Sequence, residues 1–339
     1  MGVPGLLFDL AGRGSIVLTR KDRAGFLHGL VTNDVKKLAA GQGCAAAFLT
    51  AKGKLLAECV VLCEEDRLVL DTPPELASTV EGLLHTYLVF NDVTIANETE
   101  ETHVLHLAGG AEGEGAGDLL TKVGLGEAGA LPREPHASVA ARFTFEEMPR
   151  SPGAAAGGAT SVVLVRENRT GMPGFDVRCP SSFSEEIRRA FLSAGANVAT
   201  DADLEARRIA AGIPRWGAEL TESVLPDEAG LRERGFIAEN KGCYVGQEIV
   251  ARIKTYGHVN RLLVRLSVSG GLPAPGDAVL FEGRRVGALT SVAPAAGGGA
   301  AALGYVERER AAEGTALTIS SSEGILSSVV SGRRPPQAV

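Results

Sequence analysis

The sequence lacks several features that mark specialised classes of protein. No apolar run reaches the length of a membrane span, so we expect neither a transmembrane helix nor membrane binding. The first residues lack the basic region and long apolar stretch of a secretory signal, and they are too poor in Arg and Ser for a transit peptide. The cysteines show no paired spacing typical of zinc sites or disulfide frameworks: Cys44, Cys59, Cys63, Cys179 and Cys243. We therefore expect a reduced, cytoplasmic protein without a metal site.

The chain also lacks an overall positive charge. Its 34 Lys and Arg against 41 Asp and Glu give a net charge of −7, which argues against indiscriminate nucleic-acid binding. We expect no specific nucleic-acid partner. The charge is uneven, because residues 241–265 contain five cations and a single acid, Glu248. Such a basic stretch suits an anionic ligand and also suits a solvated surface, and the sequence leaves both interpretations open.

What is present is an ordinary globular composition, 45% hydrophobic and 22% charged, in 339 residues that suit two or three domains. Residues 1–100 predict the order β-α-β-β-β-α-β, a ferredoxin-like unit with one additional strand. A similar order nearly repeats over residues 101–258. Residues 259–332 show short strand-like runs separated by Gly and Pro clusters, which predict a small antiparallel barrel. The predicted fold class is α+β, with two ferredoxin-like lobes plus a C-terminal antiparallel β-barrel.

The densest group of chemically active residues is ENKGCYVGQEIVAR, residues 239–252. Residues 240–242 predict a turn, and the apolar spacing that follows predicts a helix over residues 244–253. Cys243 would then lie at or just before a helix N-terminus. Free amides there, and the ammonium group of Lys241, favour a thiolate over a thiol.

The same stretch has less specific interpretations. Gly242 and Gly246 keep Cβ atoms away and let the backbone approach a ligand or another segment closely. A lone cysteine is also commonly a small buried hydrophobe. Glu248 and Arg252 are an i, i+4 pair of the kind that often forms an exposed salt bridge on a helix face.

The string KGCYVGQE fills every fixed position of the motif K-G-C-[FY]-x-G-Q-E and so resembles YgfZ-type folate-binding proteins. These are relatives of the glycine-cleavage T-protein, an aminomethyltransferase. Five further stretches resemble the family in the family order: GFLHGLVTNDV, AKGKLLAE, GIPRWGAEL, LPDEAGL and LGYV. The resemblance implies three domains around a central opening, with a reduced folate such as tetrahydrofolate bound in it.

The resemblance also implies folate contacts. Glu58 occupies the second acid of the T-protein's GGVIDD-like catalytic stretch, whereas Ala57 replaces the first. Met172 stands where the T-protein has a pterin-binding glutamate, and a thioether cannot accept hydrogen bonds as a carboxylate does. Asp176 is a nearby alternative acid. Arg208 matches a folate-holding arginine. Each residue also has an interpretation without a ligand. Glu58 would then be a solvent-facing residue of a strand, and Arg208 would be a helix-surface residue.

The function that the resemblance favours is a tetrahydrofolate-binding accessory protein for iron–sulfur cluster assembly or repair, with a link to tRNA modification. Its transient partners would be iron–sulfur enzymes or assembly proteins. The residues implied in chemistry are Cys243, Lys241, Gln247 and Glu248, and those implied in folate binding are Arg208, Glu58, Gly242, Tyr244 and Gly246. The alternatives are a folate-dependent aminomethyl or methyl transferase, which the losses at Ala57 and Met172 disfavour, and a folate-binding scaffold whose cysteine is structural.

Overall fold

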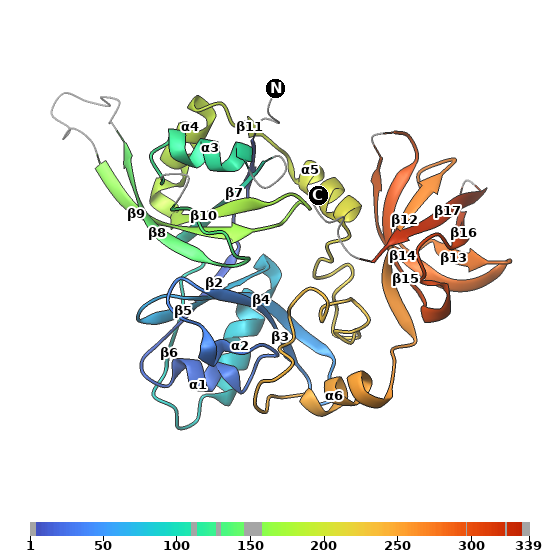
Figure 1. Ribbon diagram of the computed structural model, residues 1–339, viewed down its shortest axis with the longest axis horizontal. Coiled ribbons are helices and arrows are strands. Elements are labelled where there is room, and N and C mark those ends of the chain that lie inside the picture. Colours follow the sequence, from blue (N-terminus) through green and yellow to red (C-terminus); the bar gives the residue numbers. More distant parts are fainter. Residues whose placement is uncertain are drawn as a thin grey trace.

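The structure is a computed structural model that describes residues 5–109, 114–126, 130–145, 158–295, 297–322 and 324–333. Its main sheets are a five-stranded sheet, a six-stranded sheet and a closed barrel. Two α+β lobes lie one above the other, and the barrel stands beside them (Figure 1). This arrangement confirms the predicted α+β fold with a C-terminal antiparallel barrel. Among the described residues, no helix is long and apolar enough to cross a membrane.

The first lobe is an antiparallel sheet in the order β3-β4-β5-β2-β6, with two helices packed on one face. Its elements are β2 (Gly14–Thr19), α1 (Arg23–His28), η1 (Val35–Lys37), β3 (Gly43–Leu49), β4 (Leu55–Cys63), β5 (Arg67–Thr72), η2 (Pro74–Leu76), α2 (Ala77–Tyr87) and β6 (Thr94–Asn97). Side chains alternate along β4, so Ala57 and Cys59 join the helices in the core. Glu58 and Val60 therefore lie on the opposite face, toward the second lobe.

The second lobe is a sheet in the order β11-β1-β7-β10-β9-β8. Its elements are β1 (Leu6–Asp9), β7 (Thr102–Ala108), α3 (Glu114–Lys122), β8 (Ser138–Phe145), β9 (Gly158–Glu167), β10 (Gly174–Pro180), η4 (Ser181–Phe183), α4 (Ser184–Ser193) and β11 (Asn197–Val198). The chain thus begins in the second sheet, because β1 pairs with β7 and β11 before the chain enters the first lobe. The predicted division at residue 100 assigns this strand to the first lobe, and the division remains a prediction.

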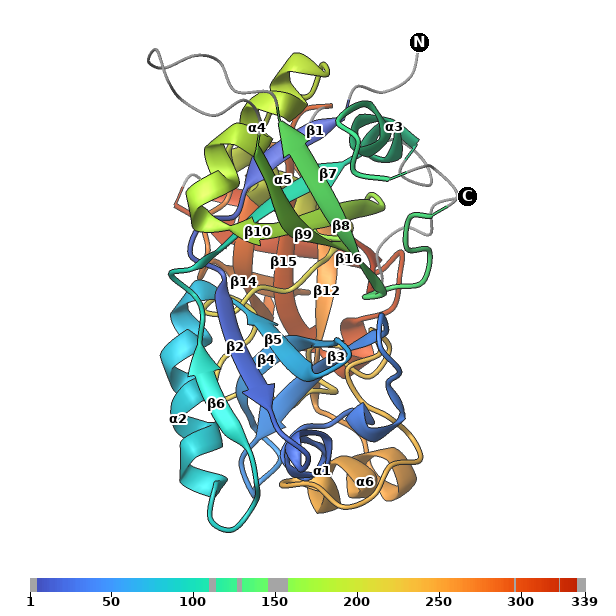
Figure 2. The same ribbon diagram turned by 90° about the vertical axis from the view of Figure 1, so that its left-hand side faces the viewer.

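The two sheets face each other across a small apolar core. Val17, Leu62 and Val69 of the first lobe pack with Val165 of β9. Because strand side chains alternate, the polar residues of the same faces are also turned toward the junction between the lobes. Figure 2 shows the two sheets stacked, with the barrel behind them.

A long connection joins the second lobe to the barrel. Helix α5 (Asp201–Ala211) begins with a capping box between Thr200 and Asp203 and ends at Gly212, whose φ of 74° is left-handed. Helix α6 (Gln247–Tyr256) then precedes the barrel. The barrel strands are β12 (Arg261–Ser269), β13 (Ala278–Phe281), β14 (Arg284–Pro294), β15 (Ala300–Glu307), β16 (Ala316–Ser321) and β17 (Gly324–Gly332), with the 3-10 turn η5 (Arg308–Arg310) after β15. All adjacent barrel strands are antiparallel.

The predicted start of the motif helix is wrong. Helix α6 begins at Gln247 and not at residue 244, because Gly246 forms its N-cap with a left-handed φ of 84°. A Cβ at position 246 would lie 2.5 Å from the carbonyl oxygen of Thr50, so this close approach to the first lobe requires glycine. Cys243 therefore lies in an irregular loop ahead of the helix, three residues before its N-cap.

Candidate functional site

A cavity of about 800 Å³ lies between the two lobes and the connection that follows α5. The first lobe contributes Glu58 and Asp71 to its wall, and the second lobe contributes Glu167 and Arg169. Another side is closed by residues 213–215 together with Glu233, Arg234 and Phe236. The resemblance implied an opening among three domains, whereas this cavity is lined by the two lobes and the connection, with no residue of the described barrel among its lining residues.

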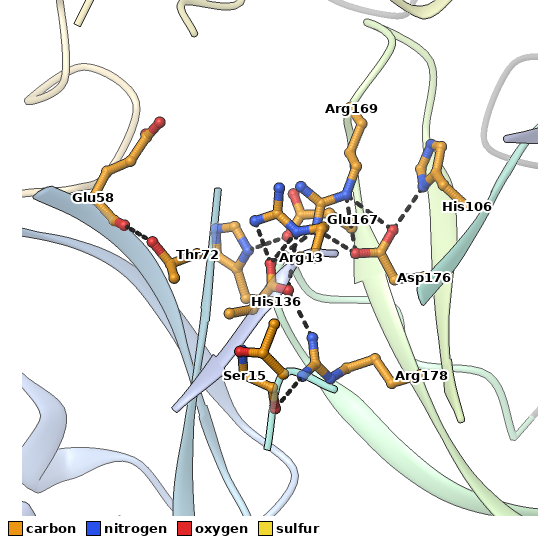
Figure 3. A network of polar contacts seen from close by, with 12 residues as sticks. Arg13, Ser15, Glu58, Thr72, His106, His136, Glu167, Arg169, Asp176 and Arg178 are labelled. Carbon is orange, nitrogen blue, oxygen red and sulfur yellow. Dashed lines mark hydrogen bonds and ion pairs between the residues drawn. The ribbon is translucent and has the colours of Figure 1, made fainter. Parts of the chain in front are cut away.

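Glu58 is the acid of this wall with the most unusual environment. Its side chain is half-buried, and its carboxylate has no hydrogen bond or ion pair to any residue in the described part of the chain. Figure 3 shows it extending away from the neighbouring cluster of charged residues. Burial raises the pKa of the Glu58 carboxyl to about 7, and the positive charges of Arg13 and Arg169 offset this rise only in part. Such a group can donate or accept a proton near neutral pH.

Asp71 is the centre of a charged cluster that joins the lobes. Its carboxylate accepts hydrogen bonds from Arg13 Nη2 at 2.6 Å, Arg178 Nη1 at 2.6 Å and Arg169 Nη2 at 3.0 Å. Burial alone would raise the pKa of Asp71, but the three guanidinium groups outweigh it and hold that pKa well below its usual range. Arg178 also donates to Ser15 Oγ at 2.9 Å.

Asp176 extends the cluster inside the second lobe. It accepts from Arg169 Nε at 3.0 Å and lies 2.8 Å from Nδ1 of His106, which is fully buried. Figure 3 shows Arg169 placed between Asp176 and the first lobe, so one side chain ties both aspartates together. The alternative acid at Asp176 is therefore part of the junction between the lobes, and it does not line the cavity.

Arg208 borders the cavity, yet its donors all have protein partners. Its Nε donates to Glu205 Oε2 at 2.6 Å, its Nη1 donates to Ile213 O and Glu219 Oε2 at 3.0 Å each, and its Nη2 donates to Glu205 and to Ser291 Oγ. These contacts use the five N–H groups of the guanidinium and join α5 to the barrel. Arg208 is buried and not a helix-surface residue, and its geometry suits a positioning role.

The KGCYVGQE loop is held against the first lobe. The ammonium group of Lys241 donates to the carbonyl oxygens of His28 at 2.7 Å, Val31, and Asn33 at 2.9 Å. Burial lowers the pKa of Lys241 to about 8. Lys241 is thus a clamp between segments more than 200 residues apart. Its ammonium is directed at carbonyl oxygens, which differs from the predicted role beside the cysteine.

Other motif residues also have structural contacts. Gln247 Oε1 accepts a hydrogen bond from the backbone N–H of Tyr244 at 3.1 Å, which orders the loop. The ring of Tyr244 lies 4.7 Å from the Lys241 ammonium group. Glu248 pairs with Arg252 at 2.9 Å, and both side chains are mostly exposed. The pair is therefore an exposed salt bridge on the face of helix α6.

Cys243 is the exposed cysteine among the five, whereas Cys59 and Cys179 are buried. It does not line the cavity, and neither do Gly242, Tyr244 or Gly246. Of the nine predicted site residues, Glu58 and Arg208 border the cavity, and the others lie in the motif loop and α6. Within the described ranges, no three His, Cys, Asp or Glu side chains gather as metal ligands.

Sequence reasoning missed most of the cavity wall. Arg13, Asp71, Arg169 and the pair of His136 with Glu167 come from segments that show no motif. One signal was available, since Ser15 and Asp71 alternate with buried apolar residues on β2 and β5, and polar residues at such positions mark a face that meets something other than the core. Met172 does not line the cavity, although its neighbours Gly171 and Pro173 do.

Similarity to known proteins agrees with this architecture. A putative transferase, At1g60990, chloroplastic, from Arabidopsis thaliana is 28% identical over 98% of this chain and 73% of its own length. The aminomethyltransferases of Bacillus pumilus and Geobacillus kaustophilus are 28% and 29% identical, each over 84% of this chain and 74% of their own length.

The fold is also that of a solved relative. The crystal structure of glycine cleavage system aminomethyltransferase T from Bartonella henselae matches with a TM-score of 0.77 at 18% identity, covering 97% of this chain and 86% of that one. The family model described as GCVT N-terminal domain matches residues 5–234, which is more than half of the 339 residues. The chain therefore belongs to the GCVT N-terminal domain family.

Proposed function

We propose that the protein binds a reduced folate, tetrahydrofolate or a derivative, in the cavity between the lobes. A volume of about 800 Å³ is in the range of small-ligand sites. A pterin presents N–H groups, for which the unpaired carboxylate of Glu58 is an acceptor. Arg133, exposed at the cavity, and Arg234 supply positive charge for the carboxylates of a glutamate tail. The observation that carries the proposal is Glu58, a half-buried acid without a protein partner in the described chain.

For the biological role, we favour a YgfZ-type accessory function in iron–sulfur cluster assembly or repair. The KGCYVGQE motif is complete, and Lys241 and Gln247 hold the loop that displays Cys243 at the surface. A surface thiol is accessible to a partner protein, and a thiolate is a natural ligand for iron. One cysteine does not hold a cluster by itself, so the iron would be shared transiently with an iron–sulfur enzyme or assembly protein.

The second candidate is a folate-dependent aminomethyl or methyl transferase, and Glu58 is the observation that favours it. A carboxyl with a pKa of about 7 suits general acid–base work beside a folate. The matched relatives in Bacillus pumilus and Geobacillus kaustophilus are named aminomethyltransferases. Two residues weigh against this candidate. Ala57 is fully buried in the first core, and Met172 lies outside the cavity lining, so neither position supplies a second acid there.

The folate proposal is tested by anaerobic calorimetric titration of tetrahydrofolate into the wild-type protein and two variants. Glu58→Gln removes the charge while preserving the size of the side chain, and we expect it to bind about tenfold more weakly or worse. Glu100→Gln is the matched control, because Glu100 is exposed and lies outside the cavity. If Glu58→Gln binds tetrahydrofolate as tightly as the wild type, Glu58 does not contribute to folate binding. If the wild type binds no tetrahydrofolate, the proposal is refuted.

The two biological roles are separated by Cys243→Ser and by a turnover assay. We expect this variant to keep tetrahydrofolate affinity, since Cys243 lies outside the cavity, and to lose rescue of iron–sulfur enzyme activity in a deficient cell. Cys63→Ser is the control, because a serine hydroxyl can replace the thiol's weak hydrogen bonds to Leu38 O and Glu64 O. Turnover with tetrahydrofolate and a lipoyl-carrier aminomethyl donor would instead favour the transferase.

A further inference from the structure

A histidine and a glutamate form a second polar point on the cavity wall, in the second lobe. Nδ1 of His136 lies 2.9 Å from Oε2 of Glu167, and both residues line the cavity (Figure 3). Their side chains are 20% and 11% exposed, so the pair is largely shielded yet open on one side. The other oxygen of Glu167 accepts the backbone N–H of Asn168 at 3.0 Å, which fixes the carboxylate.

The backbone of His136 is in a conformation that side-chain-bearing residues rarely adopt. Its φ is 61°, in the left-handed region, and two hydrogen bonds hold the turn. The His136 N–H donates to Arg166 O at 2.9 Å, and the Ala137 N–H donates to Glu134 O at 3.0 Å. Residues held in such conformations by their surroundings cluster at functional sites. This backbone conformation therefore marks the imidazole of His136 as a candidate functional group.

The first lobe is shaped to receive this histidine. A Cβ at Gly43 would lie 2.5 Å from the carbonyl oxygen of His136 and 3.1 Å from its Cβ, so glycine permits the close approach of β3. The Ser138 N–H donates to Gly41 O at 2.8 Å, which fixes the turn to the first lobe. Both lobes therefore determine where His136 lies.

The hydrogen bond to Glu167 sets the chemistry of the free nitrogen. Burial raises the pKa of the Glu167 carboxyl, but the hydrogen bond from His136 and the positive charge of Arg169 outweigh it and bring that pKa below its ordinary value, so Glu167 stays ionised. An ionised carboxylate accepts a hydrogen bond from Nδ1–H, as in the carboxylate–histidine pairs of metal sites, and in this tautomer Nε2 is the acceptor nitrogen of the ring. Nε2 has no partner among the described residues.

We propose that His136, oriented by Glu167, is a ligand-binding residue of the cavity that accepts a hydrogen bond through Nε2 from an N–H or O–H group of the bound folate. This inference rests on the proposed folate binding. It adds a contact from the second lobe to the one from Glu58 in the first, so that the ligand would be held by both lobes. Glu167 is a positioning residue, because it acts through the imidazole.

The test uses the full chain labelled with ¹⁵N-histidine, with tetrahydrofolate as the probe. In the absence of ligand, the imidazole correlations of His136 should show a proton on Nδ1. Addition of tetrahydrofolate should shift the Nε2 resonance of His136. It should leave unchanged that of His103, a carboxylate-paired histidine 2.8 Å from Asp9 and outside the cavity.

Affinity provides the second measurement. His136→Asn retains a residue type that tolerates a left-handed φ, and it should bind tetrahydrofolate about tenfold more weakly, while His103→Asn should bind as the wild type does. Glu167→Gln should weaken binding less and should change the proton position on the His136 ring.

Three results would overturn the inference. The first is wild-type affinity in His136→Asn, and the second is a His136 Nε2 resonance that tetrahydrofolate does not move; if the asparagine variant fails to fold, this resonance in the wild type decides. Both leave the folate proposal standing when the wild type binds. The third is a wild-type protein that binds no tetrahydrofolate, which refutes the folate proposal and this inference together.

Discussion

Oδ1 of Asp71 in β5 lies 2.6 Å from Nη1 of Arg178 in β10. This contact joins the two lobes through residues that are 107 positions apart in the sequence. Both side chains are buried, at 3% and 6% exposed. Each lies on the sheet face that turns away from its own lobe's helices, and the two faces meet there. The cavity exists between two lobes that a buried ionic cluster holds together.

Replacing the centre of this cluster should be costly. Asp71→Asn removes the charge that three arginines share, and leaving buried charges uncompensated typically costs about 3–5 kcal/mol in the free energy of unfolding. Urea denaturation at pH 7 measures this loss in the free energy of unfolding. The control is Asp66→Asn, because Asp66 is exposed and lies on the same hairpin. A loss below about 1 kcal/mol would contradict the role given to Asp71.

The same cluster predicts a pH dependence. The folded pKa of Asp71 lies below its ordinary value of 3.8, so its stabilising contribution is fully present above pH 3.8 and is lost as the pH falls toward the folded pKa. The stability gap between wild type and Asp71→Asn should therefore be constant from pH 5 to 7 and narrow below about pH 4. A stability difference between wild type and Asp71→Asn that widens as the pH falls would contradict a lowered pKa of Asp71 in the folded state.

Glu58 predicts the opposite behaviour. Its pKa rises from 4.5 to about 7 on folding, so the folded state holds the proton more tightly and the wild type loses stability as the pH rises between these values. Glu58→Gln should be more stable than the wild type by about 1–3 kcal/mol at pH 8, with no gain below pH 4.5. Thermal denaturation across this range measures the difference, and a less stable variant at pH 8 would argue against an unpaired carboxylate.

Lys241 should act on stability and not on ligand affinity. Lys241→Met removes donors from three carbonyl oxygens in the first lobe and should cost about 2–3 kcal/mol. Hydrogen exchange should also accelerate in residues 240–246, while exposed Lys36→Met should have no effect on either quantity. Unchanged exchange in the motif loop would show that the clamp is dispensable.

Arg208 tests whether the arginine that resembles a folate-holding residue has a structural role instead. Arg208→Ala leaves the fully buried Glu219 without its guanidinium partner, which should cost about 3–5 kcal/mol. We expect Arg208→Lys to recover part of this loss, because an ammonium group can reach one acceptor but not the planar set of five. Normal stability of Arg208→Ala combined with lost folate affinity would restore the direct-binding interpretation.

The sequence predicted the elements well where periodicity and turn residues act locally. The predicted order β-α-β-β-β-α-β over residues 1–100 is that of the first lobe from β2 to β6, and the short strands predicted after residue 259 form the barrel. The pairing of β1 with β7 could not be predicted, because nothing local indicates that the first strand belongs to a sheet formed mainly after residue 100. Long-range partners are set by the topology and not by the local pattern.

The site was only partly predictable for the same reason. Glu58 was identified by resemblance, whereas the burial that raises its pKa depends on how the lobes meet. The glycine at 246 was expected to permit close approach, and it does so against Thr50, but its left-handed φ places the helix start at Gln247 and not at residue 244. His136 carries no motif, and its importance rests on the backbone strain and on Glu167, 31 residues later.

The central claim is that the cavity between the lobes binds a reduced folate. A crystal structure of the wild-type protein grown anaerobically with tetrahydrofolate tests it most directly. We predict electron density for the pterin in the cavity, with an oxygen of Glu58 within about 3 Å of a ring N–H group. Density for the folate at any other surface, or an empty cavity at a saturating ligand concentration, would contradict the account.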